Sequence, residues 1–408
     1  MQAFYILLYM LLSAVFIVCI DSFSNNNFPT NNQQHLFANH RQHITRQTSF
    51  KLFTSTDENM YPDSTTAQNR LLVFGLGNVG SLVAERGVSL QVDDGVPFFE
   101  HVYGTTRTIQ DIDGVQSIGF DDYQELKKIL SSCTHVLVTI PPLNPPPDID
   151  TNINSNQHYC DPVLNNSTYS IKDILPTNTW IGYISSTSVY GNHDGEWVTE
   201  NSEVKCEAGT RAEVYLKAEN EWITAAKECD WKLHIFRCAG LYSINRSALH
   251  TIRKNGVEVI DNASSKKIGS PTSRIHEEDV SRAVLSAMNY NESISGNTNL
   301  WNLADDEPEV RSKVMAYGAQ LLEEANLLPK NKKAESSSTQ IVTKTTTKPK
   351  QSERASRRSI DRKRVDAQRM KELLLPDGKL IYPTYREGLK SILDSNRMKW
   401  SSDSEKIR

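Results

Sequence analysis

The sequence predicts an α/β protein built on a doubly wound parallel sheet, with a smaller C-terminal part. Two observations carry this prediction. Short apolar runs that suit buried strands alternate with longer segments of helical character, as in consecutive βαβ units. A glycine-rich turn also joins the first apolar run to the segment that follows it. Ligands of such sheets bind beyond the carboxyl ends of the strands, where the strand order reverses.

The first strand is predicted at Leu71–Phe74, and the turn GLGNVG after it matches G-x-G-x-x-G. Helical character follows at Ser81–Arg86. Gly75 would permit the turn, Gly77 would let a pyrophosphate approach the backbone, and Gly80 would let the helix pack on the strand. The helix N-terminus offers N–H groups to the phosphates. An ordinary strand-to-helix turn without a ligand is the alternative. The predicted dinucleotide contacts are Gly75, Gly77, Asn78, Val79 and Gly80.

The remaining elements follow in order along the chain. Strands are predicted where apolar residues run together, and helices where apolar residues recur at helical spacing. Proline ends the fourth strand because it removes a backbone donor. The predicted strands are Val102–Tyr103 leading into Gly104, Val115–Ile118, His135–Ile140, Trp180–Ile184 and Leu233–Cys238, and the helices are Tyr123–Leu130, Arg211–Cys229 and Glu277–Met288.

Several longer motifs occur in the order found in one superfamily. GLGNVG is followed by TIPP, SSTSVYG, RCAGLYSINRSAL and SRIHEEDVSRAV, and later by NLADDEPEVRSKVMAY and YPTYREGLKSIL. Over about residues 70 to 395, apart from a basic insertion, the chain resembles the extended short-chain dehydrogenases/reductases. Within them it is most similar to an atypical branch of the NAD(P)-dependent epimerase/dehydratase family. The resemblance implies a Rossmann-type fold and a nicotinamide dinucleotide cofactor.

The end of the second strand bears on the choice of cofactor. NAD-binding Rossmann domains hold the ribose 2′-hydroxyl with an acidic residue there, whereas an Arg accommodates the 2′-phosphate of NADP. This chain has Arg107 and no acid until Asp111, which favours NADP(H) over NAD(H). A solvated loop cation is the alternative. Pro141, after the fourth strand, is predicted to form a stiff wall beside the nicotinamide ribose, or simply to end the strand.

The resemblance also implies a catalytic hydroxyl, a Tyr and a Lys four residues after the Tyr. The hydroxyl corresponds to Thr187 in SSTSVYG. Relatives often carry Ala-Glu on the following helix, with the Glu eight residues after the Tyr. Glu219 matches that Glu. Counting back from it places Arg211 at the Tyr position and Tyr215 at the Lys position. The usual Tyr-x-x-x-Lys dyad is therefore missing. Because Arg211 and Tyr215 share a helix face, Tyr215 is the tentative acid, while Tyr190 is expected to pack beneath the site.

Two arginines are predicted to contact the substrate. Arg246 lies in the loop after the strand ending at Cys238, and Arg274 precedes the helix at Glu277–Met288. In relatives such positions approach a sugar or nucleotide-sugar, and Arg274 suits an anionic group. His276 is expected to be a structural hydrogen-bonding residue.

These residues support two main hypotheses. The first is an NADP(H)-dependent oxidoreductase or epimerase/dehydratase-like enzyme that acts on a small metabolite without the usual dyad. The alternative is a non-catalytic NADP(H)-binding redox sensor or assembly factor. A third hypothesis, a membrane-anchored interaction protein, requires an uncleaved N-terminal segment.

The N-terminus predicts targeting. Residues 1–22 contain an apolar, uncharged run that suits a signal peptide or signal anchor. Residues 23–66 begin with a stretch to Phe53 that is rich in Asn, Gln, Ser and Thr, mildly basic and free of acids, like a transit peptide. Together they resemble the two-part leaders of plastids bounded by extra membranes. A plain secretory route is the alternative.

Composition sets the remaining limits. The 408 residues carry a formal net charge of −4, which predicts no nucleic-acid partner. The cysteines show no C-x-x-C spacing and predict neither a disulfide framework nor a metal site. The expected divisions are a dinucleotide-binding domain at 67–240, a substrate-binding part at 241–395 interrupted by a disordered basic insertion at 331–358, and a tail at 396–408.

Overall fold

The computed structural model describes most of the region expected to fold. The predicted leader at 1–22, the transit-like segment at 23–66 and the basic insertion at 331–358 lie outside the described residues. Within the described part, no helix combines the length and apolar character needed to cross a bilayer. The described residues are 69–92, 95–143, 161–256, 270–290, 297–328 and 362–405.

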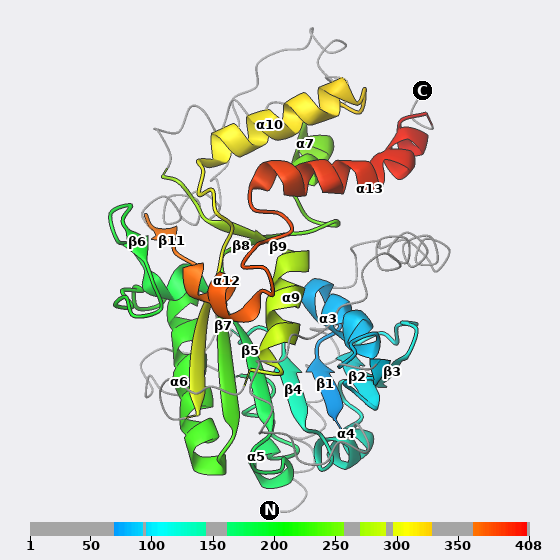
Figure 1. Cartoon of the computed structure of the whole chain (residues 1–408), viewed down its shortest axis with the longest axis vertical. Helices are drawn as coiled ribbons and strands as arrows, with labels where there is room; N and C mark the ends of the chain where they lie inside the picture. The colour runs from blue at the N-terminus through cyan, green and yellow to red at the C-terminus, as the bar shows by residue number, and fades with distance from the viewer. Residues whose placement is uncertain are drawn as a thin grey trace, which may run out of the picture. The chain divides into compact units, whose positions relative to one another are not determined.

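A seven-stranded sheet in the order β10-β7-β5-β4-β1-β2-β3 forms the centre of the molecule (Figure 1). Every neighbouring pair of its strands is parallel. The predicted doubly wound parallel sheet is thus confirmed. The strands are β1 (Arg70–Phe74), β2 (His101–Thr106), β3 (Val115–Gly119), β4 (His135–Val138), β5 (Trp180–Ser186), β7 (Lys232–Cys238) and β10 (Thr298–Leu303).

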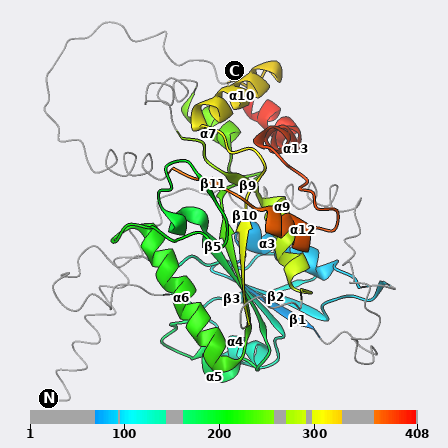
Figure 2. The same ribbon diagram turned by 60° about the vertical axis from the view of Figure 1, so that its left-hand side comes forward.

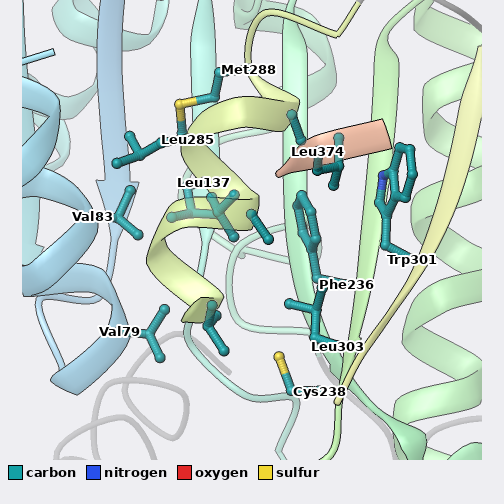
Figure 3. Packing of buried hydrophobic residues seen from close by; sticks show 14 of the residues in the cluster. Val79, Val83, Leu137, Phe236, Cys238, Leu285, Met288, Trp301, Leu303 and Leu374 are labelled. Carbon is teal, nitrogen blue, oxygen red and sulfur yellow. The ribbon is translucent and has the colours of Figure 1, made fainter. Parts of the chain in front are cut away.

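Helices cover both faces of the sheet (Figure 2). Figure 3 shows α9 between α3, which carries Val79 and Val83, and the strands that carry Phe236 and Trp301. These apolar side chains hold the helices on the sheet. The first face is covered by α3 (Asn78–Val88), α9 (Glu277–Ala287) and α12 (Gln368–Leu374), and the second by α4 (Tyr123–Leu130), α5 (Ile171–Ile174) and α6 (Arg211–Cys229).

The C-terminal part has a core of its own. Tyr242, Leu249, Met315 and Leu389 are among the side chains that bury one another there. A short parallel pair, β8 with β9, connects this part to the sheet, and a second pair joins β6 to β11. The elements are β6 (Trp197–Val198), β8 (Gly240–Tyr242), α7 (Ala248–Asn255), β9 (Arg274–His276), α10 (Arg311–Glu324), β11 (Arg364–Val365) and α13 (Tyr385–Glu405).

The predicted element order holds, with changes at the ends of some elements. The helices at Tyr123–Leu130 and Arg211–Cys229 have the predicted bounds. The fourth strand ends at Val138, two residues before the predicted Ile140. Helix α3 begins at Asn78 and so includes part of the glycine-rich turn. The sheet and its covering helices draw on residues on both sides of the expected boundary at 240.

Candidate functional site

The glycine-rich turn lies where the strand order reverses. From β1 the chain continues to β2 and β3 on one side, and then crosses to β4, β5, β7 and β10 on the other. Residues 75–80 directly follow β1. In open α/β sheets this switch point is where ligands bind.

Two glycines allow the turn to close. Gly75 has φ +97°, a conformation that side chains rarely adopt. A Cβ on Gly80 would stand 2.0 Å from the carbonyl oxygen of Gly75. The Thr139 hydroxyl lies 2.7 Å from that same oxygen and 3.0 Å from the carbonyl oxygen of Phe74. The Gly75 N–H donates to the hydroxyl of Thr105 at 3.0 Å. The turn is therefore held from β4 and β2 as well as from within.

The third glycine leaves open space. Gly77 is exposed, and a Cβ placed on it would meet no atom within 4 Å. It is the N-cap of α3, which has no side-chain cap and no acidic residue in its first turn. An uncapped helix N-terminus with space before it suits an anionic group. These residues therefore fit the pyrophosphate of a dinucleotide. Of the other predicted contacts, Asn78 is exposed beside this space and Val79 is buried in the core.

The end of β2 carries the arginine that the sequence analysis singled out. Thr106 ends the strand, and its hydroxyl donates to the carbonyl of Thr108 at 2.6 Å. Arg107 comes next and is exposed. Gln110 steadies this corner by donating to the carbonyl of Leu76 at 2.9 Å. An exposed arginine that directly follows the strand, with no carboxylate at the strand end, is compatible with a 2′-phosphate.

Thr187 follows β5 directly. It opens a single 3-10 turn, Thr187–Tyr190, and is buried. The Ser186 hydroxyl caps this turn by accepting from the N–H of Ser188 at 3.2 Å. Tyr190 is fully buried, and its hydroxyl donates to Asn302 Oδ1 at 2.7 Å. Tyr190 thus packs beneath the site, as the sequence suggested.

A buried ion pair fixes this corner of the sheet. Arg237 Nη2 donates to Glu219 Oε2 at 2.7 Å and Arg237 Nε to Glu219 Oε1 at 3.1 Å. The Ser185 hydroxyl donates to Glu219 Oε1 at 2.5 Å. The guanidinium also lies over the Tyr190 ring, 4.7 Å from its centroid. Burial lowers the pKa of Arg237, but its hydrogen bonds to Glu219, the Glu219 charge and Tyr190 together outweigh burial, so the pKa is raised overall. The carboxylate therefore joins α6 to both β5 and β7.

Helix α6 places the residues at the dyad positions. Thr210 caps it, and Arg211 is its first residue. The Arg211 guanidinium lies over the ring of Tyr215, 5.3 Å from the centroid. Tyr215 is half-buried and lies one helical turn before the buried Glu219. Lys217 instead pairs with Glu213 at 3.2 Å.

The two candidate substrate arginines differ in their surroundings. Arg246 is exposed in the loop between β8 and α7. Arg274 Nη1 donates to the carbonyls of Thr272 and Glu309 at 2.6 and 2.9 Å. Burial raises the pKa of the neighbouring Asp305 to about 8, although Arg274 opposes this shift. Much of the Arg274 hydrogen bonding is thus committed to backbone, while Arg246 is open to a ligand.

His276 has a structural position. It is buried and caps α9, with Nδ1 accepting from the N–H of Glu278 at 3.1 Å. Burial lowers its pKa to about 3. The ring is therefore neutral at physiological pH, with its proton on Nε2.

Comparisons with solved structures support the fold. A functionally unknown conserved protein from Silicibacter pomeroyi matches at a TM-score of 0.55, with 24% identity over 80% of this chain and 98% of its own. UDP-N-acetylglucosamine 4-epimerase from Bacillus cereus matches at 0.52, with 14% identity over 82% and 99%. MoeE5, solved with UDP-glucose and NAD, matches at 0.51, with 18% identity over 81% and 99%.

The chain has the same fold as MoeE5 and as this UDP-N-acetylglucosamine 4-epimerase. This confirms the resemblance to extended short-chain dehydrogenases/reductases at the level of the fold. Neither a family model nor a curated protein matched the sequence.

Several residues that shape the site escaped the sequence analysis. Thr139 holds the glycine turn, Gln110 holds the end of β2, and Arg237 anchors α6. Only Arg237 had a visible signal, because a charge inside the apolar run LHIFRC needs a buried partner.

Proposed function

We propose that this protein is an NADP(H)-binding enzyme of the epimerase/dehydratase type, with a site that departs from the usual dyad. The single observation that carries the proposal is the turn at residues 75–80. It lies at the switch point, it ends at an uncapped helix N-terminus, and Gly77 leaves space in front of that terminus. Dinucleotide phosphates need this combination. Arg107 would then bind the 2′-phosphate.

When bound, the dinucleotide supplies hydride transfer. This chain's own residues have three tasks beside it. The Thr187 hydroxyl orients the substrate oxygen, and the Tyr215 phenol exchanges a proton with it. Arg211, whose guanidinium lies over the Tyr215 ring, holds that ring in position for the exchange.

For the substrate we propose a nucleotide-sugar. Support comes from the UDP-glucose bound to MoeE5, a protein of the same fold. The exposed Arg246 suits the phosphate groups of such a molecule.

One observation favours the second candidate, a non-catalytic NADP(H)-binding sensor or assembly factor. An arginine occupies the expected Tyr position at the start of α6 and is exposed there. A protein that only binds the dinucleotide would tolerate this change. The two candidates share the binding site and differ only in turnover.

Cofactor binding is tested with the chain from residue 61 onward by titration against NADPH and NADH. We expect NADPH to bind more tightly. Arg107→Ala should weaken NADPH by roughly tenfold or more, because a charge-assisted contact to phosphate is lost, and should leave NADH almost unchanged. Absence of binding by either dinucleotide contradicts both candidates. Equal weakening of both contradicts the role of Arg107.

Catalysis is tested by following cofactor turnover and sugar products over a panel of carbonyl compounds and nucleotide-sugars. Turnover should fall about 100-fold or more in Thr187→Ala and Tyr215→Phe, with NADPH affinity retained. Turnover that both variants retain contradicts the residue assignment. Tight NADPH binding without turnover on any compound favours the sensor.

Plastid delivery by residues 1–66 is part of the proposal. A fusion of these residues to a fluorescent protein, expressed in a cell with plastids bounded by extra membranes, should accumulate in the plastid. Accumulation in the secretory pathway contradicts it.

A further inference from the structure

A hydrogen bond joins Asn78 of the glycine-rich turn to Ser243 in the C-terminal part. Asn78 is the first residue of α3, and its Nδ2 donates to the hydroxyl oxygen of Ser243 at 3.3 Å. Asn78 is exposed beside the open space at Gly77, whereas Ser243 directly follows β8 and is 1% exposed. The two residues are 165 positions apart in the chain. The contact therefore connects the phosphate end of the site with the segment that leads to Arg246.

Ser243 also organises that segment. Its N–H donates to the carbonyl of Arg246 at 2.8 Å, and the Arg246 N–H donates back at 3.1 Å. The Ser243 hydroxyl accepts from the N–H of Asn245 at 3.3 Å. A four-residue turn, Ser243–Arg246, results, and the hydroxyl that shapes it is the one that meets Asn78. The position of Ser243 thus determines where Arg246 leaves the turn.

The rest of the turn is tied to the helices of the C-terminal part. The N–H of Ile244 donates to Glu277 Oε1 at 3.1 Å, and Asn396 Nδ2 donates to the carbonyl of Ile244 at 3.1 Å. Helix α7 begins two residues after Arg246, and its Leu249 is buried against α10 and α13. The glycine-rich turn is connected to the Ser243–Arg246 turn through the side chain of Asn78.

We propose that the Asn78–Ser243 hydrogen bond couples occupation of the dinucleotide site to the order of the Ser243–Arg246 turn. The inference rests on the proposed function, since it takes residues 75–80 as the phosphate site. A phosphate held by the backbone N–H groups at the start of α3 restrains Asn78, and the Asn78 side chain then restrains Ser243. Because binding free energies are reciprocal, an anionic ligand at Arg246 would also tighten the dinucleotide. One neutral hydrogen bond supports a coupling of about three- to tenfold.

Hydrogen–deuterium exchange over residues 241–256 tests the coupling, with and without saturating NADPH. In the unmodified protein we expect NADPH to slow exchange of this segment by about three- to tenfold. Ser243→Ala should abolish that slowing while NADPH still saturates the protein. Asn78→Ala, a change at an exposed position, should do the same at a saturating concentration. Thr251→Ala removes a hydroxyl that bonds to the Ser247 carbonyl inside α7; in this matched control the slowing should persist.

Each outcome has a distinct meaning. Slowing that persists in Ser243→Ala and in Asn78→Ala overturns the coupling. NADPH binding without slowing in the unmodified protein also overturns it, and leaves the proposed function intact. Failure to bind NADPH at all overturns the proposed function, and the coupling with it. Loss of slowing in both variants but not in Thr251→Ala supports the coupling.

Discussion

At the residue scale, substitutions at two glycines of the turn, Gly80 and Gly77, are expected to have different effects: the first on the stability of the fold and the second on ligand binding. Gly80→Ala places a Cβ against the Gly75 carbonyl, 2.0 Å away, so the turn or helix α3 must move. We expect a loss of roughly 1–3 kcal/mol in the free energy of unfolding. Gly77→Ala meets no protein atom within 4 Å, and the backbone there has φ −86°, which alanine adopts. Because alanine is a poorer N-cap than glycine, the Gly77→Ala variant should lose at most about 1 kcal/mol in the free energy of unfolding, less than Gly80→Ala.

The same alanine at Gly77 should interfere with the ligand. Its methyl group would occupy the space through which a pyrophosphate approaches the backbone. NADPH affinity should fall at least about tenfold, measured by fluorescence titration alongside urea denaturation. Tight NADPH binding by Gly77→Ala would show that the phosphates do not pass this residue.

A second residue-scale prediction concerns pH. His276 is buried and neutral, and its pKa of about 3 lies far below the ordinary 6.5. Below pH 6.5 the unfolded chain binds a proton that the folded protein does not, so the contribution of His276 to stability is full above that pH. It falls by up to about 1.4 kcal/mol per pH unit as the pH drops towards 3.

His276→Asn isolates this effect, because asparagine also caps helices and does not titrate. Urea denaturation of both proteins from pH 7.5 to 5 should show the unmodified protein losing stability relative to the variant as the pH falls. Other buried groups titrate equally in both proteins, so the difference reports His276. Parallel profiles would rule the effect out.

At the scale of elements, the Glu219–Arg237 pair should dominate the attachment of α6. Both side chains are buried, so removing one leaves the other unpaired in a medium of low dielectric. Glu219→Met should cost about 3–5 kcal/mol of unfolding free energy. The double variant Glu219→Met/Arg237→Met should cost less than Glu219→Met alone, since no orphan charge remains. Urea denaturation measures both.

A surface pair provides the control. Lys172 and Glu228 are paired at 3.1 Å but largely exposed. Solvent screens such pairs, so Glu228→Gln should change stability little. If the double variant Glu219→Met/Arg237→Met is at least as unstable as Glu219→Met alone, the attachment of α6 depends on the two charges themselves.

The elements also show what could be predicted from the sequence. Helix α6 has the predicted bounds, and the structure shows what ends it: the Thr210 hydroxyl accepts from the N–H of Glu213 at its start, and Asp230 follows its last residue in a left-handed conformation. The fourth strand was placed two residues too long, because Thr139 leaves the sheet to hold the glycine turn. Pairs such as β6 with β11 join two-residue strands distant in sequence, and such strands are too short to show periodicity.

For the site, the sequence motif predicted the glycine-rich turn at residues 75–80 but not the contacts that support this turn. Gly75, Gly77 and Gly80 form a local pattern with a known physical role. Asn78–Ser243 and Glu219–Arg237 are contacts between distant segments, and one sequence alone does not reveal which side chains will meet. Spacing therefore predicted a ligand-binding turn, and the fold was needed to see which contacts hold that turn in place.

On the scale of the whole molecule, the sheet and the helices that cover it are assembled from widely separated parts of the chain. The edge strand β10 pairs with β7, although residues 239–297 separate them. Helix α12, beyond the segment 329–361, buries Met370 and Leu374 in the same cluster as Val83 of α3. The layer that contains α3 and the glycine-rich turn is therefore completed by residues near the C-terminus. An isolated segment ending near residue 240 would lack this strand and this helix.

This dependence predicts the effect of truncation. A chain ending at residue 328 loses α12 and α13 and exposes the apolar surface that they cover. Burying one large apolar side chain contributes about 1.5–3 kcal/mol to stability. The contributions of the several side chains that lose their burial here add up to more than the 5–15 kcal/mol that typically holds a protein folded. The truncated chain should be insoluble or lack a cooperative urea transition, whereas a chain ending at residue 402 should keep the full-length midpoint. Met370→Ala tests the same contact without truncation and should cost about 2–5 kcal/mol. A truncated chain with the full-length midpoint would show that the sheet folds without α12.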